Sequence, residues 1–216
     1  MRVFIALDLP VEIIDKIKKI QDALPEFVGK KTEIENLHLT LKFFGEVSED
    51  KIKQIKECLR KIKFSPRDYP SKDDTAVPSG EPSPRDDSGE PQKFQVSIDS
   101  IGVFSEKIIR IIWLHLTNCD ALQKEIDNSL KEIFKPEERF MSHLTIARVK
   151  NAGSEQSSGL ERPSVAIRKN KKEFLEKLKR IKIPKISFIV ENFKLKSSIL
   201  QSRGPVYGDI EIYPLE

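Results

Sequence analysis

The chain has 216 residues, of which 38% are apolar, so it is long enough to bury a core and is not disordered as a whole. Its two cysteines, Cys58 and Cys119, are far apart and form no CxxC or Cys/His cluster, which argues against a disulfide framework or a structural zinc site and favours the cytoplasm. The net charge of +4 is weakly basic, which suits a polyanion such as RNA without requiring one.

The first predicted element is a strand from Val3 to Leu9, an apolar run too short for a signal peptide or a membrane span. Period-two alternation or short apolar runs predict six further strands. These cover residues 37–44, 94–104, 108–116, 143–149, 186–195 and 206–213. Apolar residues at helical spacing predict four helices between them. These run from Val11 to Leu24, from Ser48 to Ile62, from Asn118 or Asp120 to Ile133, and from Phe174 to Ile181. This order predicts an α+β fold with a pseudo-repeat.

Two segments interrupt the pattern. Residues 65–92 contain six of the thirteen prolines and few apolar residues, so we expect a disordered insertion. This segment has three basic and seven acidic residues, which leaves +8 on the remainder of the chain. Residues 151–168 predict a second flexible loop.

Two copies of one short pattern point to the chemistry: His38-Leu39-Thr40-Leu41 and His143-Leu144-Thr145-Ile146. Side chains alternate across a strand, so the histidine and the threonine of each copy share a face. If the two strands pair, two imidazoles and two hydroxyls line one polar trough over an apolar core. One imidazole can then accept a proton while the other donates one, and the hydroxyls can stabilise a phosphoryl oxygen.

A third copy, His115-Leu116-Thr117, shows how weak a single match is. Thr117 runs directly into Asn118-Cys119-Asp120, which is typical of a helix start, so we expect His115 to be structural or peripheral. A metal site with His115 as a third ligand is a minor alternative, because the sequence has no HExxH motif, carboxylate cluster or cysteine ligands. It also has no P-loop, G-x-S-x-G or G-x-G-x-x-G motif, which disfavours ATP-dependent chemistry.

Lys42 and Arg148 follow the two motifs and are candidates for phosphate contacts. Strict alternation places Lys42 on the face of His38 and Arg148 on the face opposite His143. Arg148 therefore needs a β-bulge, or a position past the end of its strand, to reach the trough. The alternative for Arg148 is a surface or interstrand ion pair.

Taken together, these segments resemble the 2H phosphoesterase superfamily, and within it the RNA 2′,3′-cyclic phosphodiesterases, also called 2′-5′ RNA ligases. The resemblance covers most of the chain. It rests on HLTLKF at 38–43 and HLTIAR at 143–148, together with RVFIALDLP, Gly102-Val103-Phe104 leading to Trp113, LKSSIL and GPVYGDIEIYPL.

The resemblance implies a single bilobal α+β domain over residues 1–216, with two antiparallel sheets facing a central cleft and helices outside. It implies that His38 donates a proton to the leaving ribose oxygen, that His143 accepts one from water, and that Thr40 and Thr145 hold the phosphate. The implied reaction opens a 2′,3′-cyclic phosphate at an RNA end to a 2′-phosphomonoester, without a metal or nucleotide cofactor.

The expected partner is RNA with 2′,3′-cyclic phosphate ends, with tRNA fragments as candidates, acted on by a cytoplasmic monomer without a membrane partner. Two alternatives stay open at this point. The same site could join RNA ends through a 2′-5′ linkage without ATP, or the chain could bind RNA ends without turnover.

Overall fold

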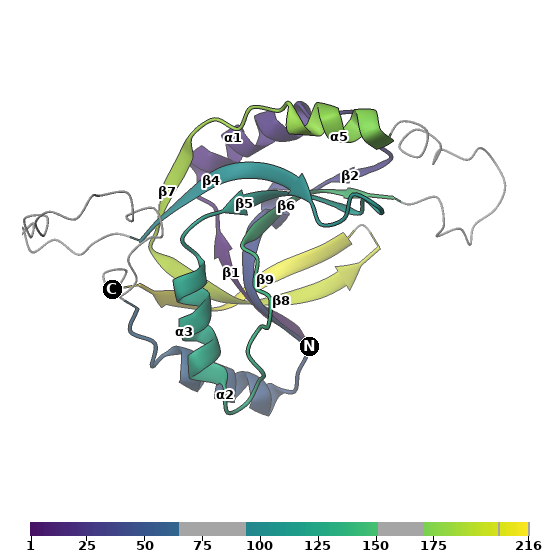
Figure 1. The fold of residues 1–216 in the computed structure, drawn as a ribbon. Helices are drawn as coiled ribbons and strands as arrows, with labels where there is room; N and C mark the ends of the chain where they lie inside the picture. Colours follow the sequence, from purple (N-terminus) through teal and green to yellow (C-terminus); the bar gives the residue numbers. More distant parts are fainter. Residues whose placement is uncertain (65–93, 151–170, 203, 216) are drawn as a thin grey trace, which may run out of the picture.

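The computed structural model describes residues 1–64, 94–150, 171–202 and 204–215. The two segments predicted to be loops, 65–92 and 151–168, lie outside these residues. Within them the fold is α+β, as predicted (Figure 1). No helix in the four described ranges is long and apolar enough to cross a membrane.

The helices and strands follow the predicted order closely. The strands are β1 (Arg2–Asp8), β2 (Gly29–Lys31), β3 (His38–Glu46), β4 (Phe94–Val103), β5 (Ile111–Leu116), β6 (His143–Val149), β7 (Ile186–Val190), β8 (Asn192–Gln201) and β9 (Gly204–Pro214). The helices are α1 (Val11–Asp22), α2 (Glu49–Leu59), α3 (Asp120–Leu130), α5 (Lys171–Lys179) and the short 3-10 turn η1 (Ile34–Asn36). The strand expected over 186–195 is divided at Glu191 into β7 and β8, and β2 was not predicted.

Local sequence explains where the helices lie. In α1 the residues Ile13, Ile17 and Ile20 recur every three or four positions and are all buried, which gives the helix one apolar face. At the start of α2 the side chain of Ser48 accepts a hydrogen bond from the backbone N–H of Lys51 at 3.3 Å, as expected for a serine N-cap.

The strands form one curled antiparallel sheet in the order β7-β4-β5-β6-β3-β1-β8-β9, with β2 paired to β6. The two predicted sheets are the two halves of this sheet, β7-β4-β5-β6 and β3-β1-β8-β9. They are joined where the two motif strands meet, and the register there is a single pair, Leu39 with Leu144. Each motif therefore lies at the inner edge of its half.

The helices are exchanged between the two halves of the sheet. Helix α1 precedes the first motif in the chain, yet it contacts β6 and β7, which belong to the half with the second motif. Helix α3 precedes the second motif, yet it contacts β3 and packs beside α2. Figure 1 shows α1 and α5 over one half and α2 and α3 beside the other. The buried apolar residues of both halves accordingly form one continuous core.

Candidate active site

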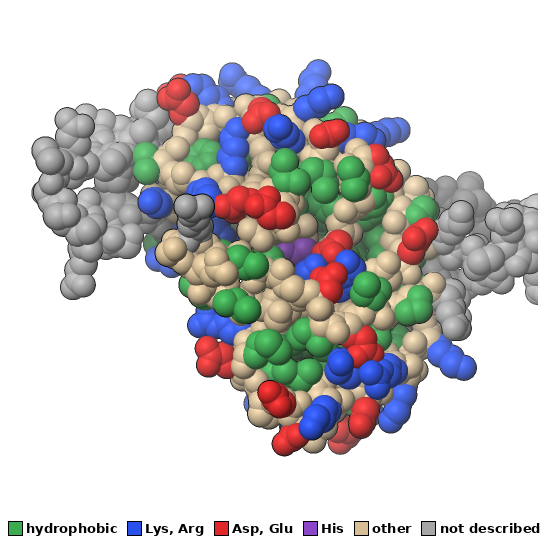
Figure 2. Space-filling model, turned by 180° about the vertical axis from the view of Figure 1, so that it is seen from behind, with side chains coloured by type: hydrophobic (Ala, Val, Ile, Leu, Met, Phe, Trp, Pro, Cys, Tyr) green, Lys and Arg blue, Asp and Glu red, His purple; other side chains and the backbone are tan. Residues whose placement is uncertain are grey.

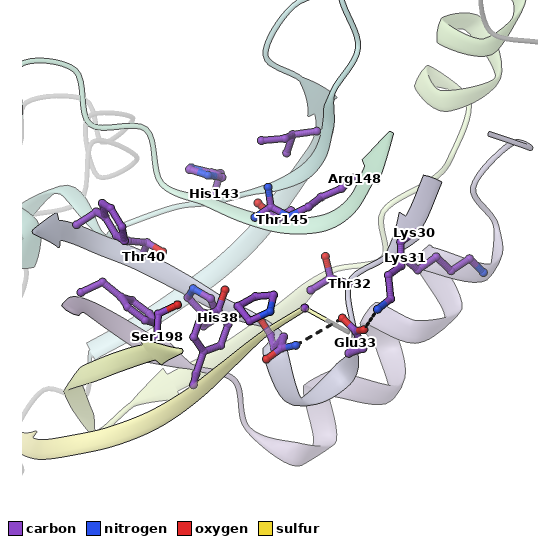
Figure 3. A pocket seen from close by; sticks show the side chains of 17 residues that line it. Lys30, Lys31, Thr32, Glu33, His38, Thr40, His143, Thr145, Arg148 and Ser198 are labelled. Carbon is purple, nitrogen blue, oxygen red and sulfur yellow. Dashed lines mark hydrogen bonds and ion pairs between the residues drawn. The ribbon is translucent and has the colours of Figure 1, made fainter. Parts of the chain in front are cut away.

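The residues of both motifs line one pocket of about 500 Å³. His38 and Thr40 come from β3, and His143, Thr145 and Arg148 come from β6. In Figure 3, His143 and Thr145 lie on one wall and His38 lies across from them. Figure 2 shows histidine surface near the centre of the opposite face of the molecule, with basic and acidic side chains beside it. The structure thus brings together five of the six residues selected from the sequence.

Both histidines are anchored in the same way. The Nδ1 atom of His38 lies 2.8 Å from the backbone oxygen of Asn36, and Nδ1 of His143 lies 2.8 Å from the backbone oxygen of Met141. A carbonyl oxygen only accepts hydrogen bonds, so Nδ1 carries the proton in each ring. This leaves Nε2 of each neutral imidazole with a free lone pair for a ligand in the pocket. The two half-sites are therefore equivalent in geometry.

A bulge in β6 turns Arg148 into the pocket. Ala147 pairs with Ile112 and Thr145 pairs with Trp113, so Ile146 is the extra residue and the alternation shifts by one position after it. The backbone oxygen of Ile146 accepts hydrogen bonds from the Gln21 side chain at 2.8 Å and from the backbone N–H of Thr32 at 2.9 Å. The bulge that the sequence required for Arg148 is present and is held by these contacts.

A matching bulge in β3 has the opposite effect on Lys42. Lys42 pairs with Ile5 and Thr40 pairs with Ala6, so Leu41 is the extra residue. The expectation that Lys42 faces the trough is wrong, because the bulge turns its side chain to the other face of the strand. There its Nζ lies 2.5 Å from Asp127 Oδ1 and 2.9 Å from the backbone oxygen of Lys135, and the side chain is only 3% exposed.

Several residues that line the pocket were missed in the sequence. Phe43 enters the pocket because of the bulge at Leu41, and the residue is 58% exposed. Lys30 and Lys31 contribute from the short strand β2, whose pattern carries no apolar alternation. Ser198 and Tyr207 come from the β8–β9 hairpin. The only signals for these two residues were the family-like stretches LKSSIL, which contains Ser198, and GPVYGDIEIYPL, which contains Tyr207.

The imidazole of His38 packs against two aromatic rings. Its ring centroid is 5.0 Å from that of Phe4 and 4.9 Å from that of Tyr207. Burial lowers the pKa of His38 below its ordinary value of 6.5, and the nearby cations Lys196 and Arg148 act in the same direction. The backbone oxygen of Asn36 and the carboxylate of Asp8 oppose the change. In the ligand-free pocket at neutral pH, His38 is therefore mainly uncharged.

This environment predicts the titration of His38. We expect its NMR midpoint to lie below pH 6.5 in the free protein and to rise when inorganic phosphate binds, because an anion stabilises the imidazolium. The same pKa shift determines how the stability of the fold depends on pH. Neutral His38 makes its full contribution to the free energy of unfolding above pH 6.5, and this contribution is lost as the pH falls through the lower pKa of the folded state. Comparison with His38→Gln assigns the signal, and a midpoint at or above 6.5 in the free protein would contradict the prediction.

His115 lies outside the pocket lining but close to it in the sheet. It is the register partner of His143, and its Nδ1 is 2.9 Å from Asp99 Oδ1. Strand β5 ends at Leu116, and Asn118 has a φ of 66°, so the chain turns away after this third copy. The described part of the chain contains no group of three or more His, Cys, Asp or Glu side chains arranged to hold a metal ion.

The comparisons with known proteins agree with this geometry. The family model described as LigT like phosphoesterase matches residues 7–85 and 117–207. A protein of Methanothermobacter thermautotrophicus named RNA 2′,3′-cyclic phosphodiesterase is 31% identical over 222 residues, which covers 100% of this chain and 99% of the relative. A Thermotoga maritima protein of the same name is 32% identical, covering 96% of this chain and 91% of the relative. The chain belongs to the LigT-like family of 2H phosphoesterases.

Solved structures show the same fold. TT0787 of Thermus thermophilus has a TM-score of 0.65 at 20% identity, covering 100% of this chain and 98% of that structure. Escherichia coli LigT complexed with phosphate has a TM-score of 0.61 at 20% identity, covering 99% of this chain and 96% of that structure. These similarities confirm the predicted fold class.

Proposed function

We propose that this protein is an RNA 2′,3′-cyclic phosphodiesterase that hydrolyses the cyclic phosphate to a 2′-phosphomonoester by acid/base catalysis between His38 and His143. The observation that carries the proposal is the pair of imidazoles, each anchored at Nδ1 and each lining the same pocket. The full-length relatives named RNA 2′,3′-cyclic phosphodiesterase support the choice of substrate.

In the proposed reaction His143 takes a proton from water as the water oxygen bonds to phosphorus. The bond from phosphorus to the ribose 3′ oxygen breaks, and His38 supplies the proton that this oxygen needs. The phosphate stays on the 2′ oxygen. His38 is mainly uncharged in the free pocket, so in this scheme it takes up its proton when the anionic substrate enters and favours the imidazolium.

Thr40, Thr145 and Arg148 are proposed to bind the phosphate. A hydroxyl can donate to a non-bridging oxygen, and a guanidinium can neutralise the charge that develops there. Arg148 forms no ion pair within residues 1–64, 94–150, 171–202 and 204–215, although it lies within electrostatic range of His38 and Tyr207. That arrangement leaves the charge of Arg148 available to an anionic ligand.

The test is incubation with a short RNA that ends in a 2′,3′-cyclic phosphate, with EDTA present, followed by identification of the product. The proposal requires the uptake of one water and a phosphate on the 2′ oxygen. A 3′-phosphate would reject the stated bond cleavage, and joined RNA ends would favour the ligase direction. The expectations of a monomer, of a cytoplasmic location and of tRNA fragments as substrates stay predictions.

Replacing Thr40 or Thr145 with valine keeps the shape of the side chain and removes its hydroxyl. We expect kcat to fall about 10²-fold for each, the size of effect seen when one oxyanion donor is removed. Thr117→Val is the matched control, because Thr117 belongs to the third His-Leu-Thr copy and its hydroxyl donates to the backbone oxygen of Ser97 outside the pocket. Equal effects of all three substitutions on kcat would show that the hydroxyls of Thr40 and Thr145 do not act on the phosphate.

A further inference from the structure

Four charged side chains form a cluster beside His38 on the three neighbouring strands β1, β8 and β9. They are Asp8, Lys194, Lys196 and Asp209. The Nζ atom of Lys196 lies 2.9 Å from both carboxylate oxygens of Asp8 and 2.7 Å from Oδ1 of Asp209. The Nζ atom of Lys194 lies 2.8 Å from Oδ2 of Asp8 and 2.7 Å from Oδ2 of Asp209. Each ammonium therefore bridges the two carboxylates, and the charges of the cluster cancel.

The strand register places Asp8 beside His38. The two residues are directly opposite each other in the antiparallel pair β1–β3. Side chains of opposed residues lie on the same face of a sheet, with Cβ atoms about 4.5–5.5 Å apart. Phe4 shares this face of β1, and its ring contacts that of His38. The Asp8 carboxylate is thus close to the imidazole, yet it is bound by the two lysines, while Nδ1 of His38 is bound to Asn36.

A carboxylate in this position affects an imidazole in two ways. It stabilises the charged form of the ring, and it offers that ring an ion pair in place of a bound phosphate. Lys196 has the opposite electrostatic effect: it lowers the pKa of His38, whereas Asp8 raises it, and the effect of Lys196 is the larger. Partly buried ion pairs are weak evidence for stability, because desolvation offsets their attraction. The position of this cluster beside a proposed catalytic ring therefore points to a second role.

Other titratable groups face His38 from the elements packed around it. Arg148 and His143 lie on β6, Tyr207 lies on β9, and Lys30, Lys31 and Glu33 line the pocket at β2 and before η1. All of them lie outside the cluster of two lysines and two aspartates. Substitutions in the cluster leave these groups in place, so a change at His38 can be assigned to the cluster.

We propose that Lys196 is a positioning residue that holds the Asp8 carboxylate away from an ion pair with His38 and so keeps the imidazole available to the phosphate. This rests on the proposed function, in which His38 protonates the leaving oxygen. An imidazolium paired with Asp8 would hold its proton more tightly and would be a weaker acid. Lys196 itself lies outside the pocket lining and acts only through Asp8 and His38.

The experiment is NMR titration of His38 in the free protein, with the pH–rate profile as a second measurement. Lys196→Met removes one cation and leaves the carboxylate, so we expect the His38 midpoint to rise by about 0.5–1 pH unit. Asp8→Asn should lower the midpoint, and the double variant should lie close to wild type because both charges are gone. The alkaline limb of the pH–rate profile should move in the same direction as the midpoint in each variant.

Two further variants separate this role from a structural one. Lys196→Arg keeps the positive charge and should keep the wild-type midpoint. Lys56→Met is the matched control, because Lys56 also pairs with a carboxylate of β9, that of Glu211 at 2.9 Å. Its midpoint should equal that of wild type. If Lys196→Met does not fold, Asp8→Asn and the double variant still give the comparison.

An unchanged midpoint in both single variants, or shifts of the same sign in Lys196→Met and Asp8→Asn, would overturn the proposal. The midpoints are measured without turnover, so they test the effect of Lys196 on His38 independently of the reaction. If the midpoints move as expected and cyclic-ended RNA is not hydrolysed, the proposed function fails and the electrostatic role of Lys196 stands.

Discussion

Alanine at His38 or at His143 is expected to lower kcat/KM for a cyclic-ended RNA by about 10²- to 10⁴-fold, which is the usual contribution of a positioned acid or base. Each side chain is only partly buried and makes one hydrogen bond to a backbone oxygen, so we expect both variants to stay folded. Because the two imidazoles act as a unit, the double variant should lose little more than the worse single variant.

The measurement is the initial rate with a cyclic-ended oligonucleotide in EDTA, with circular dichroism to confirm folding. His115→Ala is the matched control, since this histidine belongs to the third copy of the motif and is outside the pocket lining. Its rate should stay close to that of wild type. A pH–rate profile for each alanine variant then tests the roles, because loss of the acid removes the alkaline limb and loss of the base removes the acidic limb. Full activity of His38→Ala would refute the two-histidine mechanism.

Lys42→Met is expected to destabilise the protein by about 3–5 kcal/mol, the usual effect of removing one partner from a buried ion pair. Lys42 and Asp127 are 3% and 7% exposed, and the other Asp127 oxygen already accepts hydrogen bonds from Gln123 and from the backbone of Glu137. Methionine keeps the length of the side chain but leaves the carboxylate without a cation. Urea unfolding at pH 7 measures the change in the free energy of unfolding.

The same substitution at an exposed lysine is the control for this prediction. Lys177 pairs with Glu173 one helical turn away in α5, and both side chains are more than half exposed. Exposed pairs of this kind contribute little, so Lys177→Met should leave the unfolding midpoint almost unchanged. If Lys42→Met behaves like Lys177→Met, the buried pair is not the stabilising contact that we infer.

The sequence predicted the site as far as the strands keep their regular alternation. His38 with Thr40 and His143 with Thr145 are two residues apart, so a period of two sufficed to place them on one face. The prediction that Lys42 faces the pocket was wrong, because the bulge at Leu41, directly after Thr40, reverses the alternation of side chains. Bulges depend on contacts from distant segments, such as the Gln21 side chain at Ile146, and a local pattern does not reveal them.

The other residues that line the pocket could not be predicted from the sequence for a different reason. Strand β2 has three residues and contains two lysines, so neither its length nor its pattern distinguishes it from a loop. Phe43 reads as a core aromatic, and only its position after the bulge exposes it. The exchange of α1 and α3 between the halves of the sheet was also not predictable, because amphipathic spacing shows that a helix has a buried face but not which strands cover it.

That exchange restrains motion between the two walls of the pocket. The strands of the two motifs share a single register pair, Leu39 with Leu144, which by itself would restrain the two halves only weakly. However, α1 connects directly to β1 in one half and packs on the other, and α3 packs on β3 across the same boundary. Moving the two halves apart would expose the apolar face of α1 or of α3 to water, which costs free energy. The spacing of the two imidazoles is thus preorganised before any ligand arrives, and binding energy is not needed to bring acid and base together.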